Sequence, residues 1–302
     1  MVTESMVLPN LVALHRREGT DGTRELMLRF HSANPSAGLV EFLEMVVPKA
    51  DTVAVSVASA LCRREWSVVT LLEECYPPQI RATLGPASPP LLYFRGDLSL
   101  LKLPSVAIIG TRRPSAVGRA AARSWAGQLA ECGIVVVSGN APGIDATAHE
   151  TALSSGGATI VFPPASPDLF QASFRILDGE KRVLILSPFL PGHPTEKWHF
   201  HQRNELVAAH CDAAIVAETG SRGGTLNTIS HLRRLQTPWY LCELPADSAR
   251  HDAHKALSAC SAGLLPTVAN KAAVDEVWAG ITSRRLAICH AQAGDLLSGL
   301  QP

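Results

Sequence analysis

Two arginines at the end of an apolar run are the first residues whose types and spacing could do chemistry. The segment GTRRPSAVG, residues 110–118, follows SVAIIG and contains Gly110, Thr111, Arg112 and Arg113. Glycine lets a ligand approach the backbone closely, and arginine forks pair with phosphate. The N–H groups of the helix expected from Ser115 also attract anions. We interpret the segment as a phosphate site; the alternative is that the arginines form a solvated rim.

The spacing in this segment differs from two common nucleotide motifs. It is neither G-x-G-x-x-G nor the P-loop pattern G-x-x-x-x-G-K-[ST]. The segment therefore does not indicate a site for a dinucleotide or for a nucleoside triphosphate.

A second small-residue turn, SGNAPGIDATAH, covers residues 138–149 and begins with Ser138 and Gly139. Asp145 and His149 are four residues apart, so they share one face of the expected helix. A hydrolase triad of Ser138, His149 and Asp145 is disfavoured, because no G-x-S-x-G elbow is present. The simpler interpretation is that Asp145 accepts backbone N–H groups and His149 orients it, which would shape a ligand pocket.

Cations and rings alternate in KWHFHQRNE, residues 197–205. Lys197 and Arg203 flank Trp198, His199 and Phe200. Such interleaving suits single-stranded nucleic acid, whose bases stack on rings while its phosphates pair with cations. The alternative is an ordinary amphipathic lead into the helix ELVAAH. The H-x-H pair at 199 and 201 lacks a cysteine or carboxylate at ligand spacing, so we expect no metal and no cofactor.

Small residues also follow a later apolar run, in ETGSRGGTLNTIS, residues 218–230. Gly223, Gly224 and Thr225 open another expected helix, and this suits a phosphate at a helix N-terminus.

Composition restricts what these segments can do together. The chain has 302 residues, and its 27 Lys and Arg balance its 27 Asp and Glu, so nucleic-acid binding must rest on a local cluster of cations. The seven cysteines are scattered without C-x-x-C and are expected to be reduced, mostly buried thiols. No secretory h-region and no membrane-length apolar run is present, which predicts a soluble, cytoplasmic protein without membrane contact.

The elements that must position these segments begin at residue 105. Apolar runs predict strands, and helical segments separate them; the runs lie at 105–110, 134–139, 158–162, 181–187, 212–218 and 238–244. Strands that are apolar throughout are buried on both faces. We therefore predict an α/β fold with a doubly wound, mostly parallel, Rossmann-like sheet that binds ligands at its carboxyl edge.

The rest of the chain is predicted to flank this sheet. Residues 1–75 are expected to form a small helical N-terminal domain, and 76–104 a proline-rich linker or extended wrap. The Rossmann-like domain is assigned to 105–282 and a short helical tail to 283–302.

These elements together resemble the DprA/Smf family of DNA-processing proteins, over about residues 76–280. The motifs that carry the resemblance are G-[ST]-R-R-P, S-G-x-A-x-G-I-D-x-x-A-H and H-F-x-x-R-N, in that order. The resemblance implies an extended Rossmann domain that binds single-stranded DNA, helps to load the RecA recombinase and dimerises. It also implies that Arg112, Arg203 and the loop at Ser138 and Gly139 hold phosphate, while Asn204 and the turn at 223–225 shape the pocket.

Several positions depart from the family pattern. Pro142 stands where the family usually has arginine, His201 and Gln202 replace a usual Pro and Arg, and the tail after 280 is too short for a winged-helix domain. Family-like proteins also occur as antitoxin or immunity partners of a toxin in phage-defence pairs. A cognate toxin partner is therefore the first alternative.

A related fold offers an enzymatic alternative, the LOG-type nucleotide phosphoribohydrolases. Asn227 and Thr228 stand where that pattern requires acids, so this chemistry is disfavoured. A nucleotide sensor without catalysis stays open. The sequence as a whole favours a non-enzymatic protein that binds single-stranded DNA.

Overall fold

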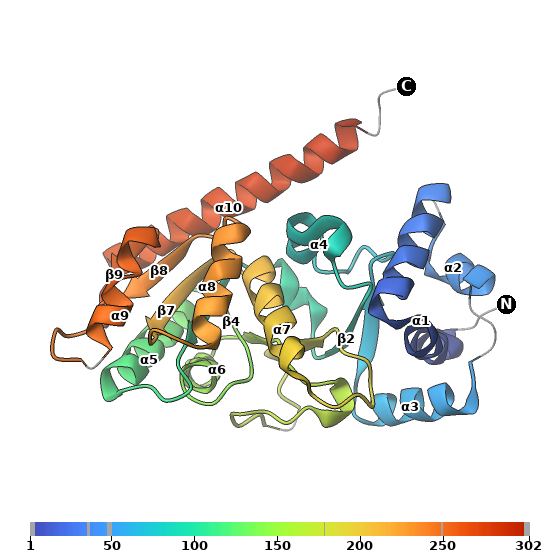
Figure 1. Ribbon diagram of the computed structural model, residues 1–302, viewed down its shortest axis with the longest axis horizontal. Helices are drawn as coiled ribbons and strands as arrows, with labels where there is room; N and C mark the ends of the chain where they lie inside the picture. The colour runs from blue at the N-terminus through green and yellow to red at the C-terminus, as the bar shows by residue number, and fades with distance from the viewer. Residues whose placement is uncertain (1–3, 35–36, 47–49, 178, 249, 299–302) are drawn as a thin grey trace.

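The computed structural model describes residues 4–34, 37–46, 50–177, 179–248 and 250–298, which form a nine-stranded sheet with helices on both faces (Figure 1). The strand order is β1-β2-β6-β5-β4-β3-β7-β8-β9. Strands β3 to β9 pair in parallel, and β1 and β2 add to the β6 edge in antiparallel pairing. The predicted doubly wound α/β class is confirmed.

The strands are β1 (Ser67–Thr70), β2 (Leu91–Arg95), β3 (Ser105–Gly110), β4 (Val135–Ser138), β5 (Thr159–Val161), β6 (Val183–Ser187), β7 (Ala213–Glu218), β8 (Trp239–Cys242) and β9 (Gly263–Leu265). The helices are α1 (Glu4–Ala33), α2 (Leu39–Val46), α3 (Thr52–Arg63), α4 (Pro78–Leu84), α5 (Ala116–Glu131), α6 (Ile144–Ser154), α7 (Lys197–His210), α8 (Gly224–Arg234), α9 (His251–Lys255) and α10 (Lys271–Ser298). All six predicted strands are present, within a few residues of the predicted ends.

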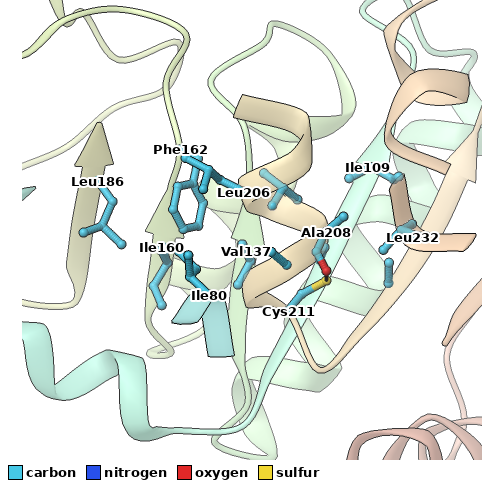
Figure 2. Packing of buried hydrophobic residues seen from close by; sticks show 14 of the residues in the cluster. Ile80, Ile109, Val137, Ile160, Phe162, Leu186, Leu206, Ala208, Cys211 and Leu232 are labelled. Carbon is cyan, nitrogen blue, oxygen red and sulfur yellow. Dashed lines mark hydrogen bonds between the residues drawn. The ribbon is translucent and has the colours of Figure 1, made fainter. Parts of the chain in front are cut away.

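Alternating side chains of the central strands supply two cores. On β3, Val106 and Ile108 face α5, α6 and α10, whereas Ala107 and Ile109 face α4, α7 and α8. Figure 2 shows the second core, where Ile160 of β5 and Phe162, just after this strand, meet Leu206 of α7 and Ile80 of α4. Burial on both faces explains why these strands are apolar throughout.

The described residues before 64 lie mostly in the helices α1, α2 and α3, as predicted. Helix α1 is broken at Gly19, whose φ of 67° a glycine adopts without strain, and it packs against α3. Trp66 and Tyr93 join α1 and α3 in one buried cluster. This region therefore contacts the β1–β2 edge of the sheet.

Two flanking segments differ in structure from the prediction. The segment 76–104 contains helix α4 and strand β2, so it is an integral part of the sheet layer rather than only a linker or wrap. Strand β1 lies inside the region expected to be helical, and α10 runs without a break through residue 283, where a separate tail was expected. The division of the chain into domains stays a prediction.

The cysteines form no disulfide among the described residues, but the expectation of mostly buried thiols is wrong. Only Cys211 and Cys242 are buried; Cys62, Cys75, Cys132, Cys260 and Cys289 are exposed. The two buried thiols lie next to or within strands of the sheet, where apolar neighbours surround them. Their burial raises the pKa of each to about 12.

The strand order reverses direction at β3. Strands β4 to β6 extend from one side of β3, and β7 to β9 from the other. The N–H of Thr111 donates to the carbonyl of Glu218 at 2.8 Å, and the register shifts between Ile109 and Gly110. Such a reversal point opens a crevice at the carboxyl ends of the strands, where this class of fold binds its ligands.

Truncation of a central strand side chain should destabilise the protein strongly. Ile160 is fully buried, so Ile160→Ala is expected to lower the free energy of unfolding by about 2–5 kcal/mol. Urea denaturation followed by circular dichroism measures this change. Leu169→Ala is the control, because that side chain is 47% exposed and should cost well under half as much.

Candidate functional site

A cavity of about 660 Å³ lies at the carboxyl ends of β3, β4 and β7, and we call it the strand-end cavity. It brings together many of the predicted site residues: Gly110, Thr111, Arg112, Gly139, Asp145, Lys197, Phe200, Arg203, Asn204, Gly223, Gly224 and Thr225. Its described lining contains four cationic side chains and, as the only carboxylate, Asp145. The predicted residues that do not line it are Arg113, Ser138, Trp198, His149 and His199.

A buried ion pair forms the floor of this cavity. Nη1 of Arg203 lies 3.4 Å from Oδ2 of Asp145, and both side chains are less than 10% exposed. A Cβ at Gly139 would overlap Nη1, so the glycine makes room for the guanidinium. Burial lowers the pKa of Arg203 and raises that of Asp145, while each partner opposes the shift of the other. Nε of Arg203 has no partner, so part of its donor capacity is unused.

The loop after β3 presents Arg112 at the rim. Its guanidinium lies over the ring of Phe200 on α7, 5.2 Å from the ring centre. The N–H of Ile144 on α6 donates to the carbonyl of Thr111 at 3.2 Å and fixes the loop. Arg113 is exposed outside the cavity. Arg112 therefore combines an exposed positive charge with a half-buried ring beside it.

The start of α5, which was expected to attract phosphate, lies against an internal carboxylate. Oε2 of Glu218, at the end of β7, accepts from the N–H of Ser115 at 2.9 Å and from its hydroxyl at 2.7 Å. Oε1 pairs with Nη1 of Arg250 at 2.5 Å, and Glu218 is only 1% exposed. An internal carboxylate thus occupies the place where an anion would bind.

The start of α8, in contrast, lies at the strand-end cavity. Gly223 has a φ of 126° and no side chain caps the helix. Nδ2 of Asn204 donates to the carbonyl of Gly224 at 3.3 Å and to Oδ1 of Asn227 at 2.9 Å, which fixes the turn. The predicted glycine-threonine turn is therefore part of the cavity wall.

His149 does not line the cavity but contacts Gly139, which does. Its Nε2 lies 2.7 Å from the carbonyl of Gly139 and its Nδ1 2.6 Å from the hydroxyl of Thr159. The carbonyl can only accept, so Nε2 carries the proton, and burial lowers the pKa of His149 to about 4. Ser138 donates to the carbonyl of Ile108 at 2.7 Å instead of contacting His149, so the triad interpretation does not hold.

Only one of the two predicted stacking rings lines the cavity. Phe200 does, whereas Trp198 is half exposed outside it and donates to Glu196 at 2.9 Å. His199 is 2% exposed, accepts from the N–H of Glu196 and stacks on Phe189 at 4.0 Å. Its role is therefore to form the start of α7 rather than to contact a ligand.

One residue that the sequence argument passed over also lines the cavity: Arg222 adds the fourth cation from the loop before α8. His201, of the H-x-H pair, adds a further ring. Arg222 stood in a segment already singled out, but nothing in its spacing indicated which way it points. Among the described residues, no group of three or more His, Cys, Asp or Glu side chains could hold a metal ion. No helix in the described ranges combines the length and apolarity needed to cross a membrane.

Comparisons with known proteins agree with this geometry. The family model described as DNA recombination-mediator protein A matches residues 67–274. The chain is 39% identical over 163 residues to DNA processing protein DprA of Streptococcus pneumoniae, covering 53% of this chain and 56% of that protein. It is 32% identical over 186 residues to Protein Smf of Synechocystis, covering 57% and 45%. The matched segment is thus about half the length of these curated relatives.

Solved structures show the same fold. The X-ray structure of DprA from Streptococcus pneumoniae aligns with a TM-score of 0.65 at 24% identity, over 88% of this chain and 95% of that chain. A structure of DNA processing protein A from Helicobacter pylori aligns with a TM-score of 0.54 at 28% identity, over 66% of this chain and 90% of that chain. The Helicobacter structure is described as giving insight into how that protein binds single-stranded DNA.

The buried histidine should make stability fall in acid. The pKa of His149 is lowered from 6.5 to about 4 by burial, so between these values the unfolded chain binds a proton that the folded chain does not. Stability is therefore full above about pH 6.5 and is lost as the pH falls toward 4. His149→Gln should remove up to about 3 kcal/mol of this dependence.

Urea denaturation of both proteins across this pH range measures the difference. Other buried histidines lower the stability of both proteins equally, so the comparison isolates His149. Parallel pH profiles would show that the unfolding of this region does not involve its protonation.

Proposed function

The chain belongs to the family of DNA recombination-mediator protein A, the DprA/Smf proteins, and on that premise we propose that its strand-end cavity binds single-stranded DNA. The observation that carries the proposal is the cavity itself. Four cations and a ring gather there at the carboxyl edge of the sheet, although the protein as a whole has no net charge. The Helicobacter relative, whose structure concerns single-stranded DNA binding, supports it.

The exposed cations would make the phosphate contacts. Arg112, Lys197 and Arg222 are exposed at the cavity, so their charges can reach a strand without a large desolvation cost. Arg203 is buried and paired with Asp145, and its unpartnered Nε is buried too, so it would contribute through its charge and through the shape of the floor. Three phosphate contacts predict a log–log salt slope of roughly −2 for a single strand.

Phe200 would supply the contact to a base. It lies half-buried in the lining beneath Arg112, so one side of the ring is supported by a cation. A base stacked on this ring would add to the contact that the guanidinium of Arg112 already makes with it.

The proposed activity is binding without catalysis. Asp145, the carboxylate in the described lining, is paired with Arg203. The side chain of Asn227 is an amide, not an acid, and it accepts a hydrogen bond from Asn204. A phosphoribohydrolase needs a carboxylate beside the ribose to stabilise developing positive charge. Release of free base from a nucleoside monophosphate by the purified protein would overturn this part of the proposal.

The partners remain proposals that rest on the family. We propose a cytoplasmic homodimer that serves DNA processing by loading RecA on the bound strand. The alternatives are a toxin partner and a nucleotide sensor. The occupied α5 terminus argues against the sensor, because Glu218 takes the place where a nucleotide phosphate would bind at the first strand.

Loss of the rim arginine should weaken DNA binding. Arg112→Ala removes a phosphate contact, so affinity for oligo-dT should fall by about tenfold and the salt slope should become less negative by about 0.7. Fluorescence anisotropy across a salt series measures both quantities.

Arg113→Ala is the matched control for this variant. It removes the same charge one residue away, outside the cavity, and should change affinity by less than about threefold. Absence of binding by the folded wild-type protein at low salt would contradict the proposed function. A pull-down would then test the partner-binding alternative.

Loss of the ring should weaken binding without changing its salt dependence. Phe200→Ala removes a stacking platform and should cost about 1–3 kcal/mol of binding free energy, with an unchanged salt slope. Trp198→Ala removes a ring that lies outside the cavity and serves as the control. Equal losses in the two variants would place the bases on the outer face of α7 instead.

A further inference from the structure

A second cavity lies at the amino ends of β8 and β9, away from the strand-end cavity, and we call it the α10 cavity. It has a volume of about 880 Å³, is open to solvent, and is lined by the end of α8, the loop before β8, part of α4 and one face of α10. In Figure 1, α10 passes over this end of the sheet layer. Its described lining includes Arg233, Arg234 and Arg284 but no aspartate or glutamate.

The buried arginine in this lining shares its nearest counter-charge, the carboxylate of Asp212, with Arg285. Arg284 is 7% exposed and donates from Nη1 to the carbonyl of Leu235 at 3.1 Å and from Nη2 to the hydroxyl of Thr83 at 3.3 Å. Its Nε has no partner, and no carboxylate oxygen of the described residues lies within 4.0 Å of it. Nearby Asp212 pairs with Arg285 at 3.5 Å instead.

Two guanidinium groups thus share the one carboxylate of Asp212, so the lost hydration of the buried Arg284 is only partly compensated. Burial lowers the pKa of Arg284, as expected for such a group. An anion in the adjoining cavity would add to this compensation.

Two further features fit a phosphate group. Arg233 is exposed in the last turn of α8 and enters the same cavity, while Arg234 pairs with Glu205 outside the lining. Arginine forks and hydroxyls, here the hydroxyl of Ser283 in the lining, are the usual donors to phosphate oxygens.

Helix α8 joins the two cavities. Its first residues line the strand-end cavity and its last residues line the α10 cavity. The helix has 11 residues, so it spans about 16 Å. A strand held at the first cavity and laid along α8 would bring a later phosphate to the second.

We propose that the α10 cavity is a second anion site, which binds a phosphate group through Arg233 and Arg284. That phosphate belongs either to the continuing DNA strand or to a free phosphate compound. Binding of a phosphate of the DNA strand rests on the proposed function, whereas binding of a free phosphate compound does not.

The test uses Arg233→Ala, because Arg233 is exposed and its loss leaves the packing of α10 intact. Oligo-dT of about 4 and about 16 nucleotides is titrated into wild type and variant by anisotropy. The long strand should bind the variant about fivefold more weakly, with a salt slope less negative by about 0.7, and the short strand should bind both equally. Arg123→Ala on α5, on the opposite face of the sheet, is the matched control and should leave both affinities unchanged.

A second titration separates the two sources of phosphate. Inorganic phosphate is titrated calorimetrically into Arg112→Ala and into Arg112→Ala combined with Arg233→Ala, so that the first cavity contributes little. Loss of phosphate binding in the double variant, without an effect on the long strand, assigns the site to a free phosphate compound. An unchanged response in both titrations overturns the second site. If neither oligonucleotide binds the wild type, the proposed function fails, and the phosphate titration alone decides the inference.

Discussion

The carboxylate of Glu218 is the interaction on which the geometry of the carboxyl edge depends. It is almost completely buried at the end of β7, and its two oxygens reach Ser115 before α5 and Arg250 before α9. A buried carboxylate is tolerated only when it is fully paired, so these partners are held in place with it. Gly118 is required because a Cβ there would overlap Oε2 of Glu218. The loop that presents Arg112 is therefore anchored on both sides of the reversal point.

At the cavity floor, a buried ion pair lies below exposed cations. Arg203 and Asp145 neutralise each other below the surface, and Gly139 leaves them room. The exposed cations stand above this pair and face solvent. A bound anion would therefore meet mobile charges first and a rigid, preorganised floor beneath them. This separation keeps the desolvation cost of binding small.

The sequence was sufficient for the central sheet because buried parallel strands are apolar without interruption, as in SVAIIG and DAAIVAE. Strand β2 was missed because prolines directly precede its five residues, and β1 because four residues carry too little pattern. Arg112, Phe200 and Arg203 were found from their types and their neighbours. The roles of Glu218 and Arg284 could not be found, since their partners lie far away in the sequence and only the fold brings them together.

The strand order also has a consequence for synthesis of the chain. Strand β3 is central, yet its neighbour β7 begins only at Ala213. A ribosome adds about 5–20 residues per second, so one edge of β3 stays without its partner for several seconds. During that interval the first half of the sheet exposes unpaired backbone N–H and C=O groups along β3, which favour association with other chains. Nascent copies of this protein should therefore depend on chaperones until Glu218 has left the exit tunnel and the two halves can join.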